Sequence, residues 1–354
     1  GTTTTQNFNL LPIPPFNLNV KVFEEATNLP VSNAQIKLVH PQITHTGISN
    51  GLGQEDLTLF YQDNYELVVG KWGFQTKCST PLIDAATQEL IVYLQKGYYD
   101  DFTFDFGWNT INNAESGSWE RAEPNPTTNT VFDQDTPLDC FNECMVTGNG
   151  SSPNTDQNDV DNGFTTLISP VFNLNGLSTP YLNYARSFYC FHGPGNFDDT
   201  LLITLSNGID QVVLEEIIAP QGDPMTWTYK SIALTGLLPF TNNMQLFVRT
   251  ADYAGNPNIT EAAFDHFSIT NESILALQDL EPALSLYPNP GQDQLSIQGL
   301  TANQRIKIYQ LDGKVYFDEI RNPTNANVLT TAFPNGFYIV EIDNSRLSWV
   351  KTGQ

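Results

Sequence analysis

The sequence predicts an all-β protein with three β-sandwich domains in tandem: a small sandwich, a larger jelly roll and a small C-terminal sandwich. Short segments alternate apolar and polar residues with the period of two that marks a half-buried strand. Of the 354 residues, only 15% are charged while 12% are aromatic, which favours packed β-structure over disorder. No amphipathic helical pattern runs longer than about three turns.

The chain begins with a tether-like end and a small sandwich. Residues 1–16 are uncharged and rich in Thr and Pro, so we expect an extended N-terminal linker or tether. Residues 17–96 contain about six or seven short strand-like runs joined by turns, with no crossover helices. This pattern predicts a small antiparallel sandwich.

The small sandwich also carries a sequence pattern of its own. A strand and T-x-x-P-V-x-x-A are followed by a glycine turn and Y-x-L-x-V-x-K-x-G-F. The matching residues are Thr27, Pro30, Val31, Ala34, Gly53, Tyr65, Leu67, Val69, Lys71, Gly73 and Phe74. This order resembles the carboxypeptidase regulatory-like, or transthyretin-like, module. The resemblance implies a non-catalytic β-sandwich that accompanies peptidases and surface proteins.

Residues 97–272 are too long for a second small sandwich and suit a jelly roll. Runs at 97–108 and 259–269 look like its first and last strands, which commonly pair. Such pairing brings Asp101 close to Asp265, and two close carboxylates repel unless a proton or cation lies between them. We therefore expect a structural calcium site formed by Asp101 and Asp265, with Asp159 or Asp161 as further ligands. The alternative is a pair of solvated acidic turns.

A second resemblance covers this region. The matching residues, in order, are 98–102, Gly107, Trp108, Gly117, Trp119, 144–149, 159–161, Gly163, Ser169, Pro170, Asp198, Asp199, Ser206, Asn207 and 261–265. The stretch is similar to MAM-like or concanavalin-like jelly-roll domains downstream of secreted bacterial metallopeptidases. The resemblance implies a non-catalytic module that often holds a structural cation.

The last part of the chain carries the most specific pattern. Residues 273–282 have few strand features and are expected to form a linker, and 283–354 form the last domain. The pattern combines a YPNP segment, a hairpin turn at Asp312-Gly313 and a PNGFYIV run. Its key residues are Tyr287, Pro288, Asn289, Pro290, Gly313, Lys314 and Gly336.

This order closely resembles the C-terminal sorting domain of type IX secretion cargo. The resemblance implies that the type IX secretion machinery is a partner. It also implies that the chain is secreted or placed at the outer cell surface of a Gram-negative bacterium. Turn chemistry alone gives only an ordinary small sandwich, which is the alternative.

The charge balance excludes several partners. With 39 acidic against 15 basic residues, the net charge is −24, which repels nucleic acid and anionic membranes and attracts divalent cations. No apolar stretch reaches the roughly 18 residues of a membrane span. We therefore expect no nucleic-acid partner and no membrane span.

The four cysteines form no CxxC pair and the four histidines are scattered, which argues against structural zinc. Cys140 and Cys144 are near enough in sequence to form a disulfide, which an extracellular protein keeps. The alternatives are free, partly buried thiols, or a bridge between Cys78 and Cys190. That bridge is less favoured because these two residues fall in different predicted domains.

No catalytic set emerges. HExxH, HxxE and GxSxG are all missing from the sequence. The neighbouring acids Asp198-Asp199 and Glu215-Glu216 point to opposite faces of a strand, so neither pair converges on a substrate. By the same alternation, His266 points away from the face of Asp265. His192, in a Gly-rich turn, is either a ligand-loop residue or a histidine that bonds to the backbone.

Aromatic residues offer either a sugar-binding platform or, more commonly, sandwich core. They are Trp108, Trp119, Tyr184, Phe188, Tyr189, Phe191 and Trp227.

Together these patterns predict a non-catalytic accessory or binding region exported by type IX secretion. The domain order resembles that of secreted zinc carboxypeptidases, which implies the C-terminal part of a metallopeptidase. Two alternatives stay open. One is a self-associating filament or surface subunit that retains its sorting domain. The other is a calcium-dependent module that binds cell-surface glycans.

Overall fold

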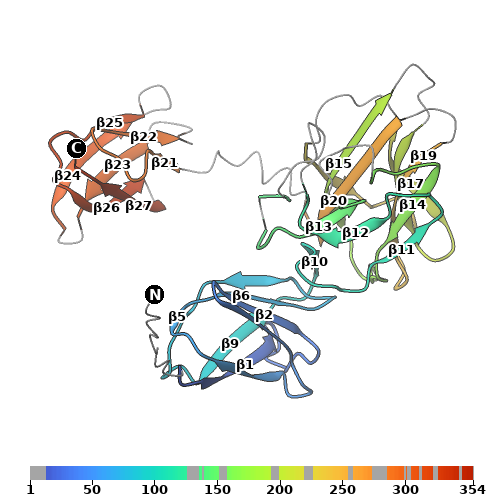
Figure 1. Cartoon of the computed structure of the whole chain (residues 1–354), viewed down its shortest axis with the longest axis horizontal. Helices are drawn as coiled ribbons and strands as arrows, with labels where there is room; N and C mark the ends of the chain where they lie inside the picture. The colour runs from blue at the N-terminus through green and yellow to red at the C-terminus, as the bar shows by residue number, and fades with distance from the viewer. Residues whose placement is uncertain are drawn as a thin grey trace, which may run out of the picture. The chain divides into compact units, whose positions relative to one another are not determined.

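The computed structural model describes residues 13–125, 135–137, 139–150, 158–192, 199–218, 226–253, 258–272, 285–298, 300, 304–310, 313–321, 326–342 and 345–353. The chain forms two compact units, Gly1–Ile274 and Leu275–Gln354, and each is described by itself. Within the described ranges every regular element is a β-strand (Figure 1), so the predicted all-β class is confirmed. The expected linker at 273–282, and most of the expected tether at 1–16, lie outside these ranges.

The larger unit begins with a small sandwich. Its first sheet has the order β4-β1-β9 and contains β1 (Phe16–Glu24), β4 (Gln54–Leu59) and β9 (Glu89–Leu94). Its second sheet has the order β3-β2-β6-β7 and contains β2 (Gln35–His40), β3 (Ile43–Ile48), β6 (Glu66–Gly70) and β7 (Lys77–Ser79). A short pair is formed by β5 (Asp63–Asn64) and β8 (Leu82–Ile83).

The alternating sequence of these strands explains how the two sheets share a core. In β1, Leu18, Val20 and Val22 are fully buried while the residues between them are not. They share a core with Ile36 and Leu38 of β2, which alternates in the same way. One pairing departs from the antiparallel expectation, because β9 runs parallel to β1. The whole second sheet lies between these strands in sequence, so no tight turn fixes their relative direction.

The larger unit continues with a large sandwich, the region predicted as a jelly roll. Its first sheet has the order β12-β13-β20-β15-β18, with β10 also paired to β20. These strands are β10 (Tyr98–Asp100), β12 (Trp119–Ala122), β13 (Cys144–Thr147), β15 (Tyr181–His192), β18 (Thr228–Ala233) and β20 (Asn258–Thr270). The second sheet, in the order β11-β14-β19-β16-β17, contains β11 (Asn109–Asn112), β14 (Gly163–Ile168), β16 (Thr200–Ser206), β17 (Gln211–Ile218) and β19 (Gln245–Asp252).

The two long strands β15 and β20 run side by side (Figure 1) and carry a bulge. Their register shifts between Asn183 and Ala185, and His266 on β20 has a φ of 54°. The extra residue changes which side chains face inward, since Phe264 and Phe267 enter the same core although they are three positions apart.

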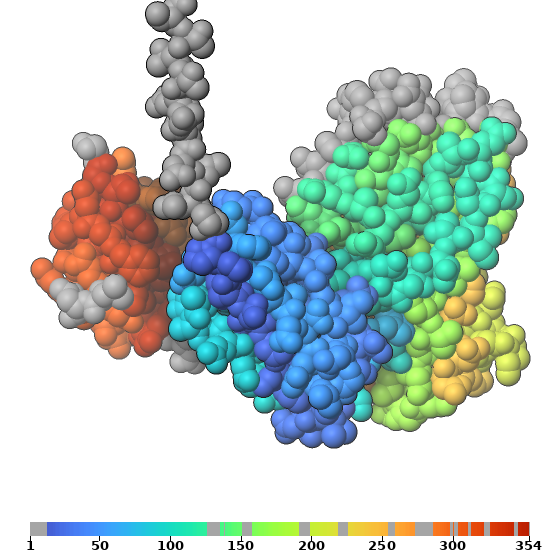
Figure 2. All heavy atoms as spheres, turned by 60° about the horizontal axis from the view of Figure 1, so that its bottom comes forward, coloured from blue at the N-terminus to red at the C-terminus, as the bar shows by residue number. Residues whose placement is uncertain are grey.

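The small and large sandwiches pack directly against each other within this unit (Figure 2). Trp72, on the turn after β6, stacks on Phe267 with ring centroids 5.6 Å apart, and its indole Nε1 donates a hydrogen bond to the carbonyl oxygen of Val171 at 2.8 Å. Lys37 Nζ of β2 lies 2.9 Å from Glu143 Oε1 of the large sandwich. The two sandwiches therefore share apolar and ionic contacts.

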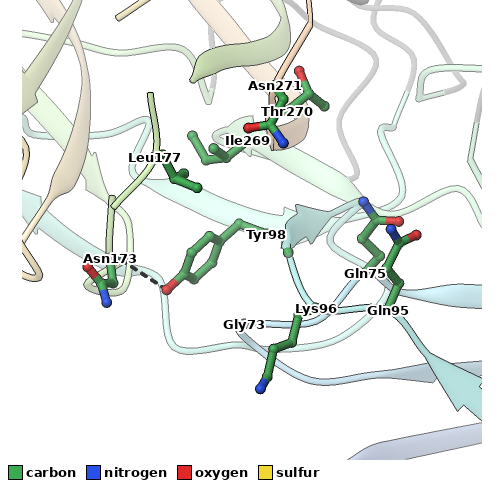
Figure 3. A pocket seen from close by; sticks show the side chains of 11 residues that line it. Gly73, Gln75, Gln95, Lys96, Tyr98, Asn173, Leu177, Ile269, Thr270 and Asn271 are labelled. Carbon is green, nitrogen blue, oxygen red and sulfur yellow. Dashed lines mark hydrogen bonds between the residues drawn. The ribbon is translucent and has the colours of Figure 1, made fainter. Parts of the chain in front are cut away.

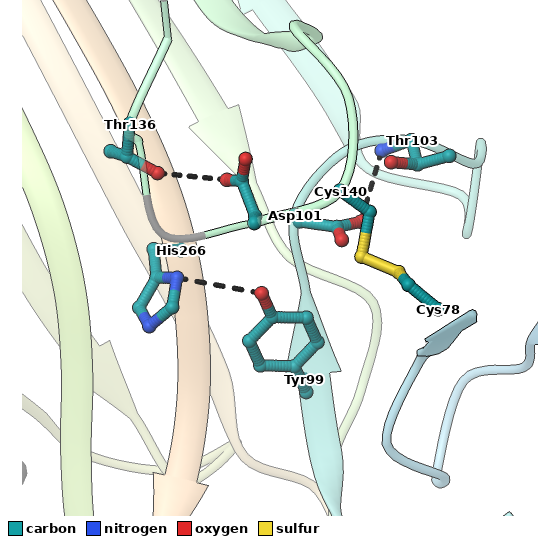
Figure 4. Close-up of a disulfide and its surroundings, with 8 residues drawn as sticks. Cys78, Tyr99, Asp101, Thr103, Thr136, Cys140 and His266 are labelled. Atoms are coloured by element: carbon teal, nitrogen blue, oxygen red, sulfur yellow. Dashed lines mark hydrogen bonds between the residues drawn. A yellow bond between two sulfur atoms is a disulfide. The ribbon is translucent and has the colours of Figure 1, made fainter. Parts of the chain in front are cut away.

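A disulfide joins the same two sandwiches. It links Cys78 of β7 to Cys140, whose Cα atoms are 6.2 Å apart (Figure 4). The predicted bridge between Cys140 and Cys144 is therefore wrong. Cys140 is already bonded to Cys78, and Cys144 is a fully buried thiol in β13 that packs beside Ala263. The alternative bridge from Cys78 to Cys190 is also wrong, because Cys190 is a buried thiol in β15.

The smaller unit is a third sandwich. One sheet has the order β21-β22-β25 and contains β21 (Ser285–Tyr287), β22 (Gln294–Gln298) and β25 (Asn327–Leu329). The other has the order β24-β23-β26-β27 and contains β23 (Gln304–Tyr309), β24 (Val315–Arg321), β26 (Gly336–Ile342) and β27 (Ser345–Lys351). Their core includes Leu295, Ile308, Tyr338, Val340 and Trp349, all fully buried.

Candidate metal centre and sorting domain

Strand pairing in the large sandwich positions the two acids singled out from the sequence. β10 pairs antiparallel with β20, placing Asp100 opposite Phe267, and Asp101 directly follows β10. Asp265 lies on β20, two residues before Phe267. Both carboxylates are removed from solvent, with 1% of Asp101 and 0% of Asp265 exposed.

Asp265 shares its surroundings with two acids that the sequence did not single out. Carboxylate oxygens of Asp135, Asp139 and Asp265 all lie within 4.8 Å of one another, and we call these residues the acid triad. Thr136 holds the triad together. Its hydroxyl oxygen lies 2.8 Å from Asp139 Oδ2 and 3.0 Å from Asp265 Oδ2, and its backbone N–H donates to Asp265 Oδ2 at 3.3 Å.

Burial and mutual repulsion raise the pKa of every acid in the triad. Burial raises the pKa of Asp135 to about 8, with the charge of Asp139 as the next cause. Burial raises the pKa of Asp139 to about 7, and the charge of Asp101 adds to it. Burial, and then the charge of Asp139, raise the pKa of Asp265 well above its usual range. Carboxylates this close need protons or a cation between them at neutral pH.

Three carboxylate oxygens at this place are buried and have no hydrogen-bond partner among the residues that the structure describes. They are Asp101 Oδ2, Asp135 Oδ2 and Glu143 Oε2. Asp101 and Glu143 border the triad, since the charges of both raise the pKa of Asp135. An unpartnered buried oxygen is costly unless positive charge faces it. Lys37 supplies one such charge, 2.9 Å from the other oxygen of Glu143.

The donor set fits calcium. Calcium takes about six to eight oxygen ligands, and carboxylates at close spacing are its usual protein ligands. Asp135, Asp139 and Asp265 offer such oxygens within 4.8 Å of one another, and Asp101 lies near enough for its charge to raise the pKa of both Asp135 and Asp139. The disulfide is beside it, because the Asp101 carboxylate lies within 4.8 Å of both sulfur atoms of the bridge between Cys78 and Cys140 (Figure 4). The bridge thereby anchors the segment that carries Asp139.

The other two predicted ligands lie elsewhere in the large sandwich. Asp159 Oδ2 accepts a hydrogen bond from the backbone N–H of Thr260 at 3.2 Å, and Asp161 Oδ2 accepts one from the Ser116 hydroxyl at 2.9 Å. Burial, with the charge of Asp161, raises the pKa of Asp159 to about 7. These acids neighbour Glu261. Burial, and then the charge of Asp159, raise the pKa of Glu261 well above its usual range. Glu261 and Asp265 are four residues apart on one strand, about 13 Å, so one ion does not reach both.

His266 lies on the same side of β20 as Asp265, which corrects the expectation from strict alternation. The hydroxyl of Tyr99 lies 3.5 Å from His266 Nδ1. The charge of Asp265 also reaches this tyrosine, where it adds to the effect of burial in raising the pKa of Tyr99. The bulge at His266 is the physical cause, because one extra residue places two successive side chains on one face.

The spacing of the missed acids was visible in the sequence. Asp135, Asp139 and Glu143 follow one another at intervals of four around Cys140. Only the approach of this segment to β20 makes them neighbours of Asp265, and that approach has no local signal.

The remaining candidate residues have structural surroundings. Trp119, Tyr184, Phe188 and Tyr189 are at most 7% exposed and belong to core clusters, and Trp108 and Trp227 pack against such clusters. They offer no open sugar platform. The side chains of Phe191 and His192, and Asp198 as a whole, lie outside the described residues.

The candidate acid Glu215 is held by two basic side chains. It accepts a hydrogen bond from Arg186 Nη2 at 2.6 Å and lies 2.9 Å from Lys230 Nζ.

In the third sandwich, the YPNP segment packs onto the last strand. The Trp349 indole donates to the carbonyl oxygen of Pro288 at 2.8 Å, and the backbone N–H of Val350 donates to Asn289 Oδ1 at 3.0 Å. Tyr287 remains 67% exposed. A Cβ on Gly291 would lie 2.8 Å from Trp349, so only glycine allows this close approach.

The hairpin residues of the motif also have defined places. Gly313 has a φ of 84°, which favours glycine in this turn, while Asp312 lies outside the described residues. Lys314 Nζ lies 5.1 Å from the ring centroid of Tyr316, and Gly336 begins β26.

Residues 285–352 match the family model of the secretion system C-terminal sorting domain. No curated protein matches the chain.

Two of the solved structures that resemble the chain match about half of it. The K1 cleaved adhesin domain of Lys-gingipain from Porphyromonas gingivalis W83 is 16% identical, with a TM-score of 0.32, and the match covers 50% of this chain and 99% of that one. The family 11 carbohydrate-binding module from Clostridium thermocellum is 10% identical, with a TM-score of 0.28, and the match covers 49% and 94%. Such low TM-scores carry no inference about ligand or activity.

The described residues contain no helix with the length and apolar character of a membrane span. The predicted export signal is confirmed. The chain carries a secretion system C-terminal sorting domain at residues 285–352, and it is type IX secretion cargo delivered to the outer cell surface or the extracellular space of a Gram-negative bacterium.

Proposed function

We propose that residues 17–272 are a non-catalytic binding region that type IX secretion delivers to the cell surface, with calcium completing the acid triad. The main support for this proposal is the combination of two features. The chain carries a sorting domain, and the two sandwiches of its larger unit are joined by the disulfide between Cys78 and Cys140. Disulfides persist in oxidising, extracellular surroundings. A disulfide-joined pair of sandwiches is suited to presenting a fixed surface outside the cell.

The environment of the buried acids supports a binding role over a catalytic one. Asp100 accepts hydrogen bonds from the backbone N–H of Phe102 at 2.9 Å and from the Trp108 indole at 2.7 Å. Glu215 is held between Arg186 and Lys230. These carboxylates hold the fold together, and neither faces a nucleophile among its described contacts.

Calcium has a structural role in this proposal. It supplies positive charge to the acid triad and to the oxygens of Asp101 and Asp135 that have no hydrogen-bond partner within the described ranges. It thereby links β20 and the residue after β10 to the segment that the disulfide anchors. Removal of the ion leaves repelling carboxylates beside β20 in the large sandwich.

The finer assignment is a region from the C-terminal part of a zinc metallopeptidase. Its support is the resemblance of residues 17–96 to the carboxypeptidase regulatory-like module and of residues 97–272 to MAM-like jelly rolls. Reading the open reading frame upstream of Gly1 tests this assignment. A peptidase domain there supports it, and a signal peptide directly before Gly1 contradicts it.

Export and binding are tested together in cells. The complete protein and a version without residues 285–352 are expressed in a host with type IX secretion. The complete protein is expected at the surface or in the medium, and the shortened one in the periplasm. Surface protein that retains no ligand from host glycan or protein arrays, but hydrolyses peptide or glycoside substrates, contradicts a binding role.

A further inference from the structure

A groove of about 650 Å³ lies between the small and large sandwiches (Figure 3). This volume is within the range of small-molecule sites, which is about 300–1,000 Å³. Gln75 and Gln95 line it from the small sandwich, and Asn173 and Asn271 from the large one. Neither sandwich forms the groove alone.

The walls of the groove are held in place by the backbone. The N–H of Gln75 donates to the carbonyl oxygen of Gln95 at 2.8 Å, and the N–H of Gly97 donates to that of Gly73 at 3.2 Å. A Cβ on Gly97 would lie 3.2 Å from Gln75 Cγ, so glycine here leaves room for the glutamine side chain. The site is therefore formed before any ligand arrives, which lowers the entropic cost of binding.

Three of the polar side chains that line the groove are uncommitted amides. The side-chain amides of Gln75, Gln95 and Asn271 make no hydrogen bond to any described residue, and Gln95 and Asn271 are exposed. Each amide offers donors and an acceptor in one plane. Paired donors and acceptors suit the neighbouring hydroxyl groups of a sugar ring.

The groove also has an apolar floor. The ring of Tyr98 crosses it (Figure 3), held against Trp72 at 5.3 Å between ring centroids. The Tyr98 hydroxyl accepts a hydrogen bond from the backbone N–H of Asn173 at 2.9 Å. Leu177 and Ile269 lie beside it. A fixed aromatic ring with aliphatic neighbours offers a surface for the C–H face of a sugar.

Charge distinguishes this groove from the rest of the protein. The chain has a net charge of −24, yet none of the described residues that line the groove is Asp or Glu. Its charged residue, Lys96, forms an ion pair with Glu24 at 3.0 Å. The net negative charge of the chain disfavours anionic ligands, whereas the described lining of the groove carries little charge of either sign.

We propose that this groove binds a neutral glycan chain. The proposal rests on the binding role proposed above and names the site and ligand class for it. An extended peptide is disfavoured, because the four amides lie on turns and strand ends rather than along an open strand edge.

The test uses the complete chain and neutral β-linked gluco-, galacto- and manno-oligosaccharides, measured by titration calorimetry at low and high salt. We expect binding of one series with little salt dependence. Gln75→Ala and Gln95→Ala are each expected to weaken that binding about five- to tenfold, and the double variant by more. Melting temperatures of all variants are compared with the parent to show that they fold.

Gln88→Ala is the matched control, since Gln88 is an exposed glutamine next to β9 that does not line the groove. It is expected to leave affinity unchanged. If the groove variants bind oligosaccharide as tightly as the parent, the groove is not the binding site. The proposed binding role of the region is then unaffected. The proposal that the ligand is a neutral glycan is overturned if no neutral oligosaccharide binds. It is also overturned if a peptide library binds more tightly and Gln75→Ala abolishes that binding.

Discussion

Trp72 of the small sandwich stacks on Phe267 of the large sandwich, with ring planes 20° apart and centroids 5.6 Å apart. The contact continues the aromatic core of the large sandwich into its neighbour, since Trp72 also lies 6.4 Å from Trp108. Two modules with separate sequence patterns are thus packed as one unit. This packing has consequences for stability that can be measured.

Replacing Trp72 by Ala is expected to lower the free energy of unfolding of the larger unit by about 2–3 kcal/mol. The loss comprises ring burial and the hydrogen bond to Val171. Urea denaturation followed by tryptophan fluorescence measures it. Trp72→Phe, which keeps an aromatic ring but not the indole N–H, is the control and is expected to lose about half as much. An unchanged midpoint for Trp72→Ala contradicts the shared core.

Calcium is expected to raise the stability of the larger unit, and chelation to lower it. At a calcium concentration about 100 times the Kd, the gain in the free energy of unfolding is about 2.7 kcal/mol. Asp139→Asn removes one ligand of the triad and is expected to abolish most of this gain. Asp105→Asn is the control, because Asp105 is exposed and lies outside the triad, and its carboxylate accepts a hydrogen bond from the backbone N–H of Gly107. If the parent protein gives identical melting curves with calcium and with chelator, the acid triad does not bind calcium.

Without calcium, stability is expected to fall as pH rises from about 4 to about 8. Burial raises the pKa of Asp135 to about 8 and of Asp139 to about 7, so the folded state binds more protons than the unfolded state in this window. The stabilisation is complete below the unfolded pKa and is lost as pH rises through the folded values.

The comparison that checks this is urea denaturation across that window. Asp135→Asn is expected to flatten part of the decline, since Asp100 and Asp159 have raised pKa values of their own. Saturating calcium is expected to reverse the slope, because calcium binds deprotonated carboxylates. A stability that rises with pH in chelator contradicts the raised pKa values.

Loss of the disulfide is expected to destabilise the larger unit by about 4 kcal/mol. The bridge joins residues with a sequence separation of 62. The value of about 4 kcal/mol is the loss of conformational entropy that a loop of this length imposes on the unfolded chain. Cys78→Ser with Cys140→Ser measures it, and calcium affinity is expected to fall because the segment carrying Asp139 loses its anchor.

Thiol counting checks the pairing independently. Cys144 and Cys190 are both 0% exposed, so the native protein is expected to show no reactive thiol. The unfolded, unreduced protein is expected to show those two alone. A labelled Cys78 would contradict the bridge.

Local patterns account for what the sequence predicted well. The all-β class follows from strands such as β1, where alternate residues are buried, because the period of two is a property of each strand by itself. The sorting domain was identified from the YPNP segment and from turn residues such as Gly313, whose φ of 84° is a local requirement of its hairpin. The class and the export signal were therefore determined by the sequence.

Tertiary structure decided the rest. The partner of Cys78, the approach of Asp135 and Asp139 to Asp265, and the groove between Gln75 and Asn271 all join residues from distant segments. Their proximity depends on how the two sandwiches pack and on a bulge at His266, and short-range periodicity carries no information about either. Strand content is a local property of the chain, whereas a site is a meeting of segments that only the folded molecule brings together.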